Sequence, residues 1–396
     1  MKKKIIIIGG GFAGLSAMRR LGTLRRLWQD RFEVLLIDPK ADFEFLPMLP
    51  DVVGGKVSPG SLRFPLDPAC RRAGCKFLKE KATRVDVLNR NVHCAERIIE
   101  YEYLLMASGA KTDFHGDQEL EKTCFKLNSV DDAVGIRNEV ISRVSSGRKV
   151  NILIAGGGYT GVELSASIAV FLKKGGIRGR VIVTEPASDI LLASPVWVRD
   201  LCRKELESMD VEILTGESLK MFRDGTAFLG SRGKVDNAFC VWTAGVRTGR
   251  VMDNVPGKKY RTRLGVDEFL NPVECARGEN VFAAGDAAAF SPGASERPLR
   301  MAVMFAMGQG KRAAENIVGS IEGKPLIPYR AEDLGYVIPL SKGKAPGIVL
   351  GKEIHPRIGY LLHYFMCLYR APFMGKLRIA KDIIFKRRGK WIEKTH

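Results

Sequence analysis

The sequence has few of the residues that build metal sites and disulfide frameworks. Its eight cysteines are scattered over 396 residues with no C-x-x-C pair, and its five histidines show no spacing typical of metal ligands. These absences argue against a zinc site and against a disulfide scaffold, so no metal is expected. A nucleophile and base pair of the hydrolase kind is also missing.

Long apolar runs are absent too. No stretch approaches the roughly 18 to 20 apolar residues that span a bilayer. The segment from Lys2 to Ile8 resembles the start of a signal peptide, but glycines and then Arg19 and Arg20 follow at once. We interpret it as a buried strand, and expect neither a signal peptide nor a transmembrane helix.

Acidic residues are in deficit, since 63 Lys and Arg face 44 Asp and Glu and leave a net charge of +19. This balance favours an anionic partner such as nucleic acid, acidic lipid or a dinucleotide, although basic composition alone is the alternative. Nothing resembles a nucleic-acid module, so that partner is not expected. Glycine, by contrast, is plentiful at 42 residues, which indicates tight turns and close backbone approaches.

The N-terminal segment predicts a strand, a glycine turn and a helix. Ile5–Ile8 can bury both faces of a parallel strand, and Gly9-x-Gly11-x-x-Gly14 follows immediately. The next predicted strand, Phe32–Ile37, ends in Asp38, 24 residues after the last glycine. An acid at this place faces a ribose in dinucleotide-binding folds.

The same arrangement recurs 147 residues later. A predicted strand, Val150–Ala155, leads into Gly156-x-Gly158-x-x-Gly161 and a helix. A further strand, Val181–Thr184, ends in Glu185, again 24 residues after the last glycine.

Each part of this repeat has a physical reason. The first glycine permits the turn, the second lets phosphate approach the backbone, and the third lets helix and strand pack closely. The helix N-terminus offers free N–H groups to the pyrophosphate. Two dinucleotides are therefore expected, and both acids favour NADH over NADPH because a carboxylate repels a 2′-phosphate. Helix-end or solvent-facing roles for Asp38 and Glu185 stay open.

Several segments resemble the two-dinucleotide flavoprotein superfamily. Tyr103–Gly109 and Trp242–Val246 are similar to its two return turns, and Asn280–Asp286 is similar to its second flavin signature. Within the superfamily the chain resembles type II NADH:quinone oxidoreductases and the related sulfide:quinone oxidoreductases, through Phe45–Pro47 and Gly161–Glu163.

The resemblance implies an α/β fold with two Rossmann-like domains, the second inserted in the first. The expected FAD-binding domain covers residues 1–112 and 256–325, the NADH-binding domain 113–255, and a C-terminal amphipathic module 326–396. FAD and NAD(H) are the implied cofactors, with hydride passing from NADH to flavin and two electrons passing on to a quinone-like acceptor without proton pumping.

The resemblance also assigns site residues. Glu163 and Pro47 are the expected catalytic residues, although an acid is also favoured at a helix N-terminus without any catalytic role. The expected cofactor-binding residues are Gly9, Gly11, Phe12, Ala13, Gly14, Asp38, Pro39, Ala107, Ser108, Gly109, Gly285 and Asp286 for FAD, and Gly156, Gly158, Tyr159, Thr160, Gly161, Glu185, Ala244 and Gly245 for NADH.

The acceptor side departs from the family. The family has two glutamines in an A-Q-x-x-x-Q helix, and these positions align with Met304 and Gly308 of this chain. Gln309 lies one residue after the second of them. Met304, Phe305, Gly308 and Gln309 are the candidate acceptor-site residues, and a methionine-rich helix that only forms core is the alternative.

The positions of the cysteines argue against two other functions, disulfide reduction and sulfide oxidation. A redox disulfide between Cys70 and Cys75 is disfavoured, because the superfamily's pair would open the helix soon after Asp38. Cys124, Cys240 and Cys367 do not sit in recognisable sulfide-oxidation motifs. Sulfide oxidation and an NADH-sensing role through partner binding are the remaining rivals.

The C-terminal tail carries the uneven charge. Residues 351–396 hold eleven Lys or Arg and three Asp or Glu, interleaved with apolar residues such as Ile379, Ile383 and Ile384 before Lys386–Arg388. This pattern indicates an interfacial helix on anionic lipid, which would place the protein on the cytoplasmic face of the cell membrane. The alternative is a helix packed on its own domain or on a second copy in a homodimer.

Overall fold

The structure, a computed structural model, describes residues 2–145, 150–276, 278–293, 295, 297–340 and 343–385. The chain forms two compact units. The first contains Met1–Phe43, Phe64–Lys111 and Val246–Asp333, and the second contains Glu44–Arg63, Thr112–Gly245 and Leu334–His396. The domain boundaries expected at residues 112, 255 and 325 stay predictions.

The first unit is built on a five-stranded parallel sheet in the order β21-β9-β1-β2-β5. Ile5, Ile6 and Ile7 of its central strand are fully buried, as both-sided burial of a parallel strand requires. The strands are β1 (Lys3–Ile8), β2 (Phe32–Ile37), β5 (Lys76–Leu78), β9 (Tyr103–Met106) and β21 (Val281–Ala283).

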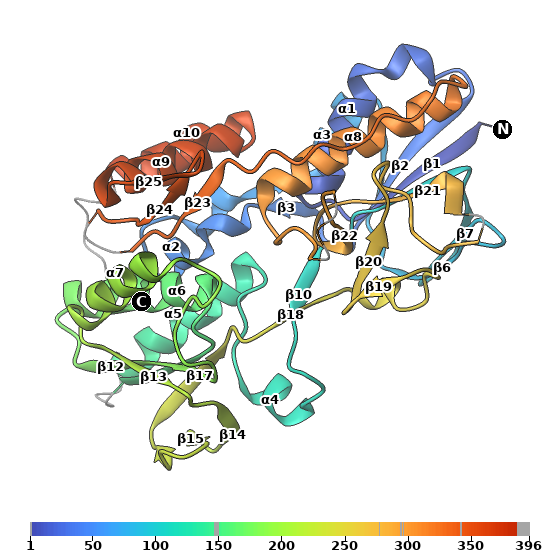
Figure 1. The fold of residues 1–396 in the computed structure, drawn as a ribbon. Helices are drawn as coiled ribbons and strands as arrows, with labels where there is room; N and C mark the ends of the chain where they lie inside the picture. The colour runs from blue at the N-terminus through green and yellow to red at the C-terminus, as the bar shows by residue number, and fades with distance from the viewer. Residues whose placement is uncertain are drawn as a thin grey trace. The chain divides into compact units, whose positions relative to one another are not determined.

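Two helices of this unit, α1 (Phe12–Thr23) and α8 (Val303–Ile321), lie alongside one another (Figure 1). Gly310 sets their approach, since a Cβ there would lie 2.1 Å from the carbonyl oxygen of Ala13. The unit's other elements are α3 (Leu66–Arg72), the sheet β6 (Ala82–Asp86), β7 (Asn91–Cys94) and β8 (Ile98–Glu100), the sheet β19 (Lys259–Tyr260), β20 (Arg263–Val266) and β22 (Ala288–Phe290), and the short helices η1 (Arg25–Leu27), η4 (Arg250–Met252), η5 (Gly278–Asn280) and η6 (Gly285–Ala287).

The second unit has its own parallel sheet, in the order β13-β12-β11-β17. Its strands are β11 (Val150–Ala155), β12 (Gly179–Glu185), β13 (Val211–Thr215) and β17 (Ala238–Trp242). Around it lie α4 (Gln118–Thr123), α5 (Val130–Ser145), α6 (Tyr159–Lys174), α7 (Val196–Glu207) and the sheet β14 (Leu219–Arg223), β15 (Thr226–Leu229) and β16 (Lys234–Val235). Two short ladders, β3 (Asp42–Glu44) with β4 (Arg63–Pro65) and β10 (Ala110–Thr112) with β18 (Val246–Thr248), occur where the chain changes unit.

The segment between β3 and β4 and the C-terminal elements also belong to the second unit. The former contains η2 (Leu46–Met48), α2 (Leu49–Val53) and η3 (Pro59–Leu62), and the latter β23 (Gly335–Val337), β24 (Gly347–Val349), β25 (Lys352–Ile354), α9 (Pro356–Arg370) and α10 (Phe373–Phe385). Helix α2 packs against α6 at Gly54, where a Cβ would lie 3.2 Å from the carbonyl oxygen of Ser167. Helix α10 is held by Asp382, whose carboxylate accepts hydrogen bonds from the Ser58 amide and the Ser61 hydroxyl, both at 2.8 Å.

The predicted α/β fold with parallel sheets is confirmed. Strands β2 and β11 have the predicted bounds, whereas β12 is longer than the predicted Val181–Thr184. The apolar stripe expected on the last helix is divided, because Ile379 is fully buried while Ile384 is 61% exposed. Lys386–Arg388 lie outside the described residues. No helix in the described part of the chain combines the length and the apolar character that crossing a bilayer requires.

Candidate functional site

The first glycine turn is built as its sequence predicts. Gly9 has φ +106°, and a Cβ there would lie 2.2 Å from the Ala107 carbonyl oxygen. A Cβ at Gly14 would lie 1.9 Å from the Gly9 carbonyl oxygen, so only glycine lets α1 start this close to the turn. At Gly11 a Cβ would meet no protein atom within 4 Å. The second glycine thus borders the space that a phosphate needs.

The second turn repeats this geometry. Gly156 has φ +118°, and a Cβ there would lie 2.8 Å from the Ala244 amide nitrogen. A Cβ at Gly161 would lie 1.9 Å from the Gly156 carbonyl oxygen, and a Cβ at Gly158 would again meet nothing within 4 Å. The two turns are therefore equivalent backbone cradles at the start of α1 and of α6.

Each cradle has its acid where the sequence predicts it. Asp38 accepts hydrogen bonds from the amides of Gly10 and Lys40, both at 2.7 Å. Glu185 accepts hydrogen bonds from the amides of Gly157 at 2.8 Å and Ala187 at 2.9 Å. Both carboxylates are thus tied to the middle of their glycine turns, at the edge where an adenosine ribose lies in this kind of fold.

The predicted return turns lie against the first glycine of each cradle. The Ala107 amide donates to the Ile8 carbonyl at 2.8 Å, and the Thr243 amide donates to the Ala155 carbonyl at 2.8 Å. The hydroxyl of Ser108 is buried and has no hydrogen-bond partner among the described residues. A buried hydroxyl of this kind is a candidate contact for a bound ligand.

The second flavin signature also reaches the first cradle. Gly285, at φ +70°, lies so near α1 that a Cβ there would be 3.0 Å from the Cβ of Ala13. Its amide donates a 2.7 Å hydrogen bond to the side-chain oxygen of Gln309, which is 1% exposed. Burial raises the pKa of the neighbouring Asp286, and the charge of Arg263 opposes that shift.

The candidate acceptor residues occupy the first turns of α8 in different settings. Phe305 is buried, Met304 is half-buried, and Gln309 uses its oxygen to brace Gly285. A Cβ at Gly308 would lie 3.3 Å from the ring of Tyr329, so this tyrosine fills the space beside it. Their role at an acceptor site stays a prediction. A separate cavity of about 660 Å³ in this unit, lined in part by Tyr329 and Phe290, contains none of the predicted site residues.

Glu163 is the fifth residue of α6, two positions after Gly161, and is half-buried. Burial, and after it the negative charge of Asp51 on α2, raises its pKa to about 8. The carboxyl group therefore holds a proton through most of the neutral range. This is the behaviour of a general acid or a proton relay.

Asp51 belongs to a polar network that the sequence pattern does not predict. The Tyr364 hydroxyl donates to Asp51 at 2.8 Å, and the Lys56 ammonium lies 3.7 Å from the same oxygen. Lys56 also donates to the hydroxyls of Tyr364 and Tyr360. The sequence holds one signal of this network, since Asp51 is the one acidic residue inside the apolar run Leu46–Val53. Pro47, the other expected catalytic residue, lies in η2 at the start of this run.

The cysteines of the described chain are free thiols, and most are unsuited to redox chemistry. Burial raises the pKa of Cys70 to about 11 and of Cys75 to about 12, and both thiols are therefore protonated near neutral pH. A hydrogen bond with Cys240 lowers the pKa of Cys124, but that pair lies in the apolar core of the second unit. No group of three or more metal-ligating side chains occurs among the residues described.

Two equivalent glycine cradles on two parallel sheets are typical of the two-dinucleotide class of proteins. The family model for pyridine nucleotide-disulphide oxidoreductases matches residues 3–310, and the chain belongs to this family. The type II NADH:quinone oxidoreductase of Staphylococcus saprophyticus is 24% identical over 98% of this chain and 96% of its own. Demethylphylloquinone reductase NdbB of Synechocystis is 25% identical over 99% and 98%.

Solved structures share the fold over nearly the whole chain. NDH2 from Plasmodium falciparum in complex with NADH has a TM-score of 0.86 at 15% identity, covering 99% of this chain and 100% of that one. The sulfide:quinone oxidoreductase of Aquifex aeolicus has a TM-score of 0.77 at 18% identity, covering 97% and 96%. The resemblance inferred from the motifs is confirmed.

Proposed function

We propose that this protein is an FAD-dependent NADH oxidoreductase of the type II NADH:quinone kind, which passes two electrons to a quinone without pumping protons. The observation that carries the proposal is the pair of cradles, each with an open second glycine and a tethered acid. Relatives that match almost the whole chain and are named as NADH:quinone oxidoreductases support it.

The residues of the first cradle fit FAD. Gly11 leaves space for the pyrophosphate, Asp38 presents a carboxylate for the ribose diol, and the buried Ser108 hydroxyl lacks a protein partner among the described residues. Gly285 closes against the same helix start, and Asp286 follows it in the chain. Bound FAD supplies the two-electron redox chemistry.

The second cradle would bind the donor. Glu185 orients the ribose, and the N-terminus of α6 faces the pyrophosphate at Gly158. Glu163 would hold a proton for the reduction, because its carboxyl group stays protonated near neutral pH. Pro47 on η2 is the second proposed catalytic residue of this unit. In the first unit, the proposed acceptor-site residues on α8 are Met304, Phe305, Gly308 and Gln309.

The test is an anaerobic titration of the yellow holoenzyme, followed by absorbance at the flavin band. NADH should bleach the band, while NADPH and sulfide should not, and a short-chain quinone should restore it. Bleaching by sulfide alone would select sulfide oxidation instead. Tight NADH binding with slow reoxidation by every acceptor would select a sensor.

A membrane surface is the proposed partner of α9 and α10. These helices expose Ile358 (52%), Leu361 (70%), Phe365 (61%), Tyr369 (65%), Leu377 (67%), Ile384 (61%) and Phe385 (66%). Arg357, Arg378 and Lys381 are exposed on the same two helices. Apolar and cationic side chains together suit anionic lipid, and this supports the proposal that the protein binds peripherally at the cytoplasmic face of the membrane.

Flotation with vesicles of phosphatidylcholine and phosphatidylglycerol tests this surface. The Leu361→Ser, Phe365→Ser variant should lose most of its vesicle binding, and Ile98→Ser, a matched change at a 62% exposed residue of β8, should not. Equal binding by both variants would contradict a lipid role. Light scattering would then show whether the face is buried in a homodimer.

A further inference from the structure

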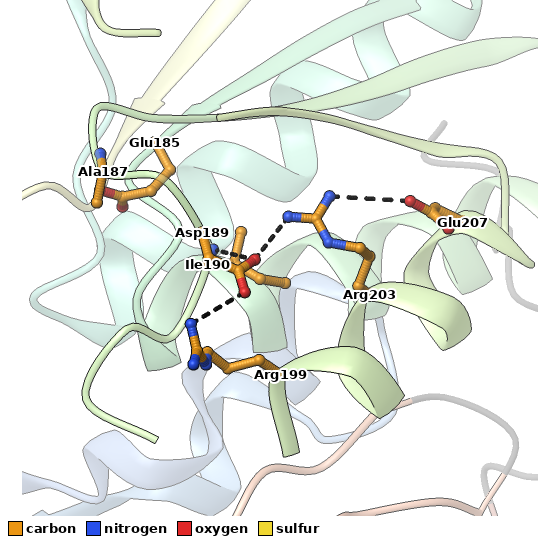
Figure 2. Close-up of polar contacts among 7 residues, drawn as sticks. All are labelled: Glu185, Ala187, Asp189, Ile190, Arg199, Arg203 and Glu207. Atoms are coloured by element: carbon orange, nitrogen blue, oxygen red, sulfur yellow. Dashed lines mark hydrogen bonds and ion pairs between the residues drawn. The ribbon is translucent and has the colours of Figure 1, made fainter. Parts of the chain in front are cut away.

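The loop after Glu185 carries a charge cluster that the proposed function does not use. Asp189 accepts from Arg203 at 2.6 Å, from Arg199 at 3.2 Å and from the Ile190 amide at 2.9 Å. Figure 2 shows the Asp189 carboxylate lying between the two guanidinium groups, which project from α7. One acid on the loop thus engages two cations of the following helix.

This loop lies directly against the second glycine turn. A Cβ at Gly157 would lie 2.8 Å from the side chain of Ile190 and 3.0 Å from that of Glu185. The Leu191 amide donates to the Gly157 carbonyl at 2.9 Å. Asp189 precedes Ile190, so the cluster borders the edge at which Glu185 faces the ribose.

The Asp189 carboxylate is fully paired in this cluster, whereas one N–H group of Arg199 lacks a partner among the described residues. Burial alone would raise the pKa of Asp189, but the hydrogen bond and charge of Arg203, the Ile190 amide and the charge of Arg199 outweigh it and lower that pKa. The Nε of Arg199 is buried and has no hydrogen-bond partner among the residues described. Glu207 adds only a distant contact, 3.9 Å from Arg203.

We propose that Asp189 is a specificity-determining residue of the donor site. It holds Arg199 and Arg203 against the loop, so that neither guanidinium serves a 2′-phosphate on the neighbouring ribose. Glu185 repels that phosphate and Asp189 withholds the cations that would bind it. The inference rests on the proposed function, in which the second unit binds NADH.

The physical argument is a competition for two guanidinium groups. Arginine binds carboxylate and phosphate through the same forked N–H geometry, so the half-buried carboxylate of Asp189, already in place, competes with a phosphate of the ligand for the two guanidinium groups. Asparagine at 189 would keep an oxygen for the Ile190 amide and remove the charge. The arginines would then be free to pair with a dianionic phosphate.

The test compares donor binding by four forms of the FAD-containing holoenzyme: wild type, Asp189→Asn, Glu185→Gln and the double variant. Calorimetry measures the affinity for ADP-ribose and for 2′-phospho-ADP-ribose. Stopped-flow absorbance measures the rate of flavin reduction by NADH and by NADPH. Asp189→Asn should raise the preference for the phosphorylated ligand about tenfold, and the double variant should raise it by more than either single change. Arg199→Ala in the double variant should remove the gain.

The matched control is Asp200→Asn, which removes an exposed acid of the same helix and should leave the preference unchanged. An equal gain in Asp200→Asn would mean that net charge alone acts, and would overturn the proposal. So would unchanged preference in Asp189→Asn while ADP-ribose still binds. Failure of the wild type to bind ADP-ribose at all would instead contradict the proposed function.

Discussion

The two glycine turns share one backbone design but differ in what braces them. Beside the first turn, α8 packs on α1 at Gly310, and Gly285 approaches Ala13 from a separate stretch of chain. Beside the second turn lie its own return turn, at Thr243 and Ala244, and the loop that follows Glu185. Both turns have a return turn beside them, but among the described residues the approaches of α8 and Gly285 are additional at the first turn, and we expect a ligand there to exchange more slowly. This difference matches a resident flavin and an exchanging donor.

The strongest test of this comparison replaces the second glycine in each turn. Gly11 and Gly158 have extended conformations that any residue adopts, with φ −76° and −75°, and a Cβ has free space at both. Gly11→Leu should therefore fold and lose FAD. Gly158→Leu should keep FAD and lose reduction by NADH, with each affinity falling at least about 100-fold, because phosphate can no longer reach the backbone.

Flavin absorbance of the purified protein and NADH titration measure the two losses. After FAD is removed from all three proteins, the free energy of thermal unfolding of each variant should stay within about 1 kcal/mol of the wild-type value, which separates a binding defect from misfolding. The reverse pattern, with FAD lost in Gly158→Leu, would show that the two cradles are assigned the wrong way round.

A second contrast lies two residues after each third glycine. In α1 this position is Ser16, whose hydroxyl donates to the Met307 carbonyl at 2.7 Å, and in α6 it is Glu163. The pKa of Glu163 is raised from 4.5 to about 8, so folding favours its protonated form. Its contribution to stability is complete below about pH 4.5 and is lost as the pH rises to about 8.

Glu163→Gln removes this titration. The variant's free energy of unfolding should change less between pH 5 and 8 than that of the wild type, by at most about 1.4 kcal/mol for each unit of the pKa shift and by less because the side chain is half-buried. Urea unfolding at several pH values measures it. The charge of Asp51 raises the pKa of Glu163, so Asp51→Asn should lower that pKa and raise the free energy of unfolding near pH 8. If the loss of stability moved to higher pH instead, Asp51 would have to stabilise the charged form of Glu163.

The sequence predicted the parts of the site that depend on local backbone chemistry. The glycine turns and the bounds of β2 and β11 follow from short-range rules, and the structure has them, whereas the hydrogen bonds that tie Asp38 and Glu185 to the turns were not predicted. The network of Asp51 with Tyr364 could not be predicted, because 313 residues separate the two partners. Burial of Ile379 is likewise a tertiary property, decided by what α10 packs against rather than by its helical periodicity.

A smaller effect is expected from the hydrogen bond by which Gln309 braces Gly285 beside the first cradle. Gln309→Met keeps most of the side-chain volume but leaves the buried amide of Gly285 without its acceptor, at a cost of about 1–3 kcal/mol. The variant should lose FAD more readily on dilution and keep its affinity for NADH. Met304→Leu, a change at a half-buried position of the same helix, is the control. Equal FAD retention in both variants would contradict the brace.

The smallest effect is expected at the cysteines of the first unit, despite the family's association with disulfides. Cys70 and Cys75 are buried thiols whose raised pKa values, about 11 and about 12, leave almost no thiolate near neutral pH. The Cys70→Ala, Cys75→Ala variant should therefore reduce quinone within about twofold of the wild-type rate, with only the modest loss of stability that removing two small buried groups causes. NADH-dependent quinone reduction, measured before and after treatment with a thiol alkylating reagent, checks this. Turnover abolished in the double variant while FAD and fold persist would mean that electrons pass through these sulfurs, so that the first cradle would serve a disulfide reductase.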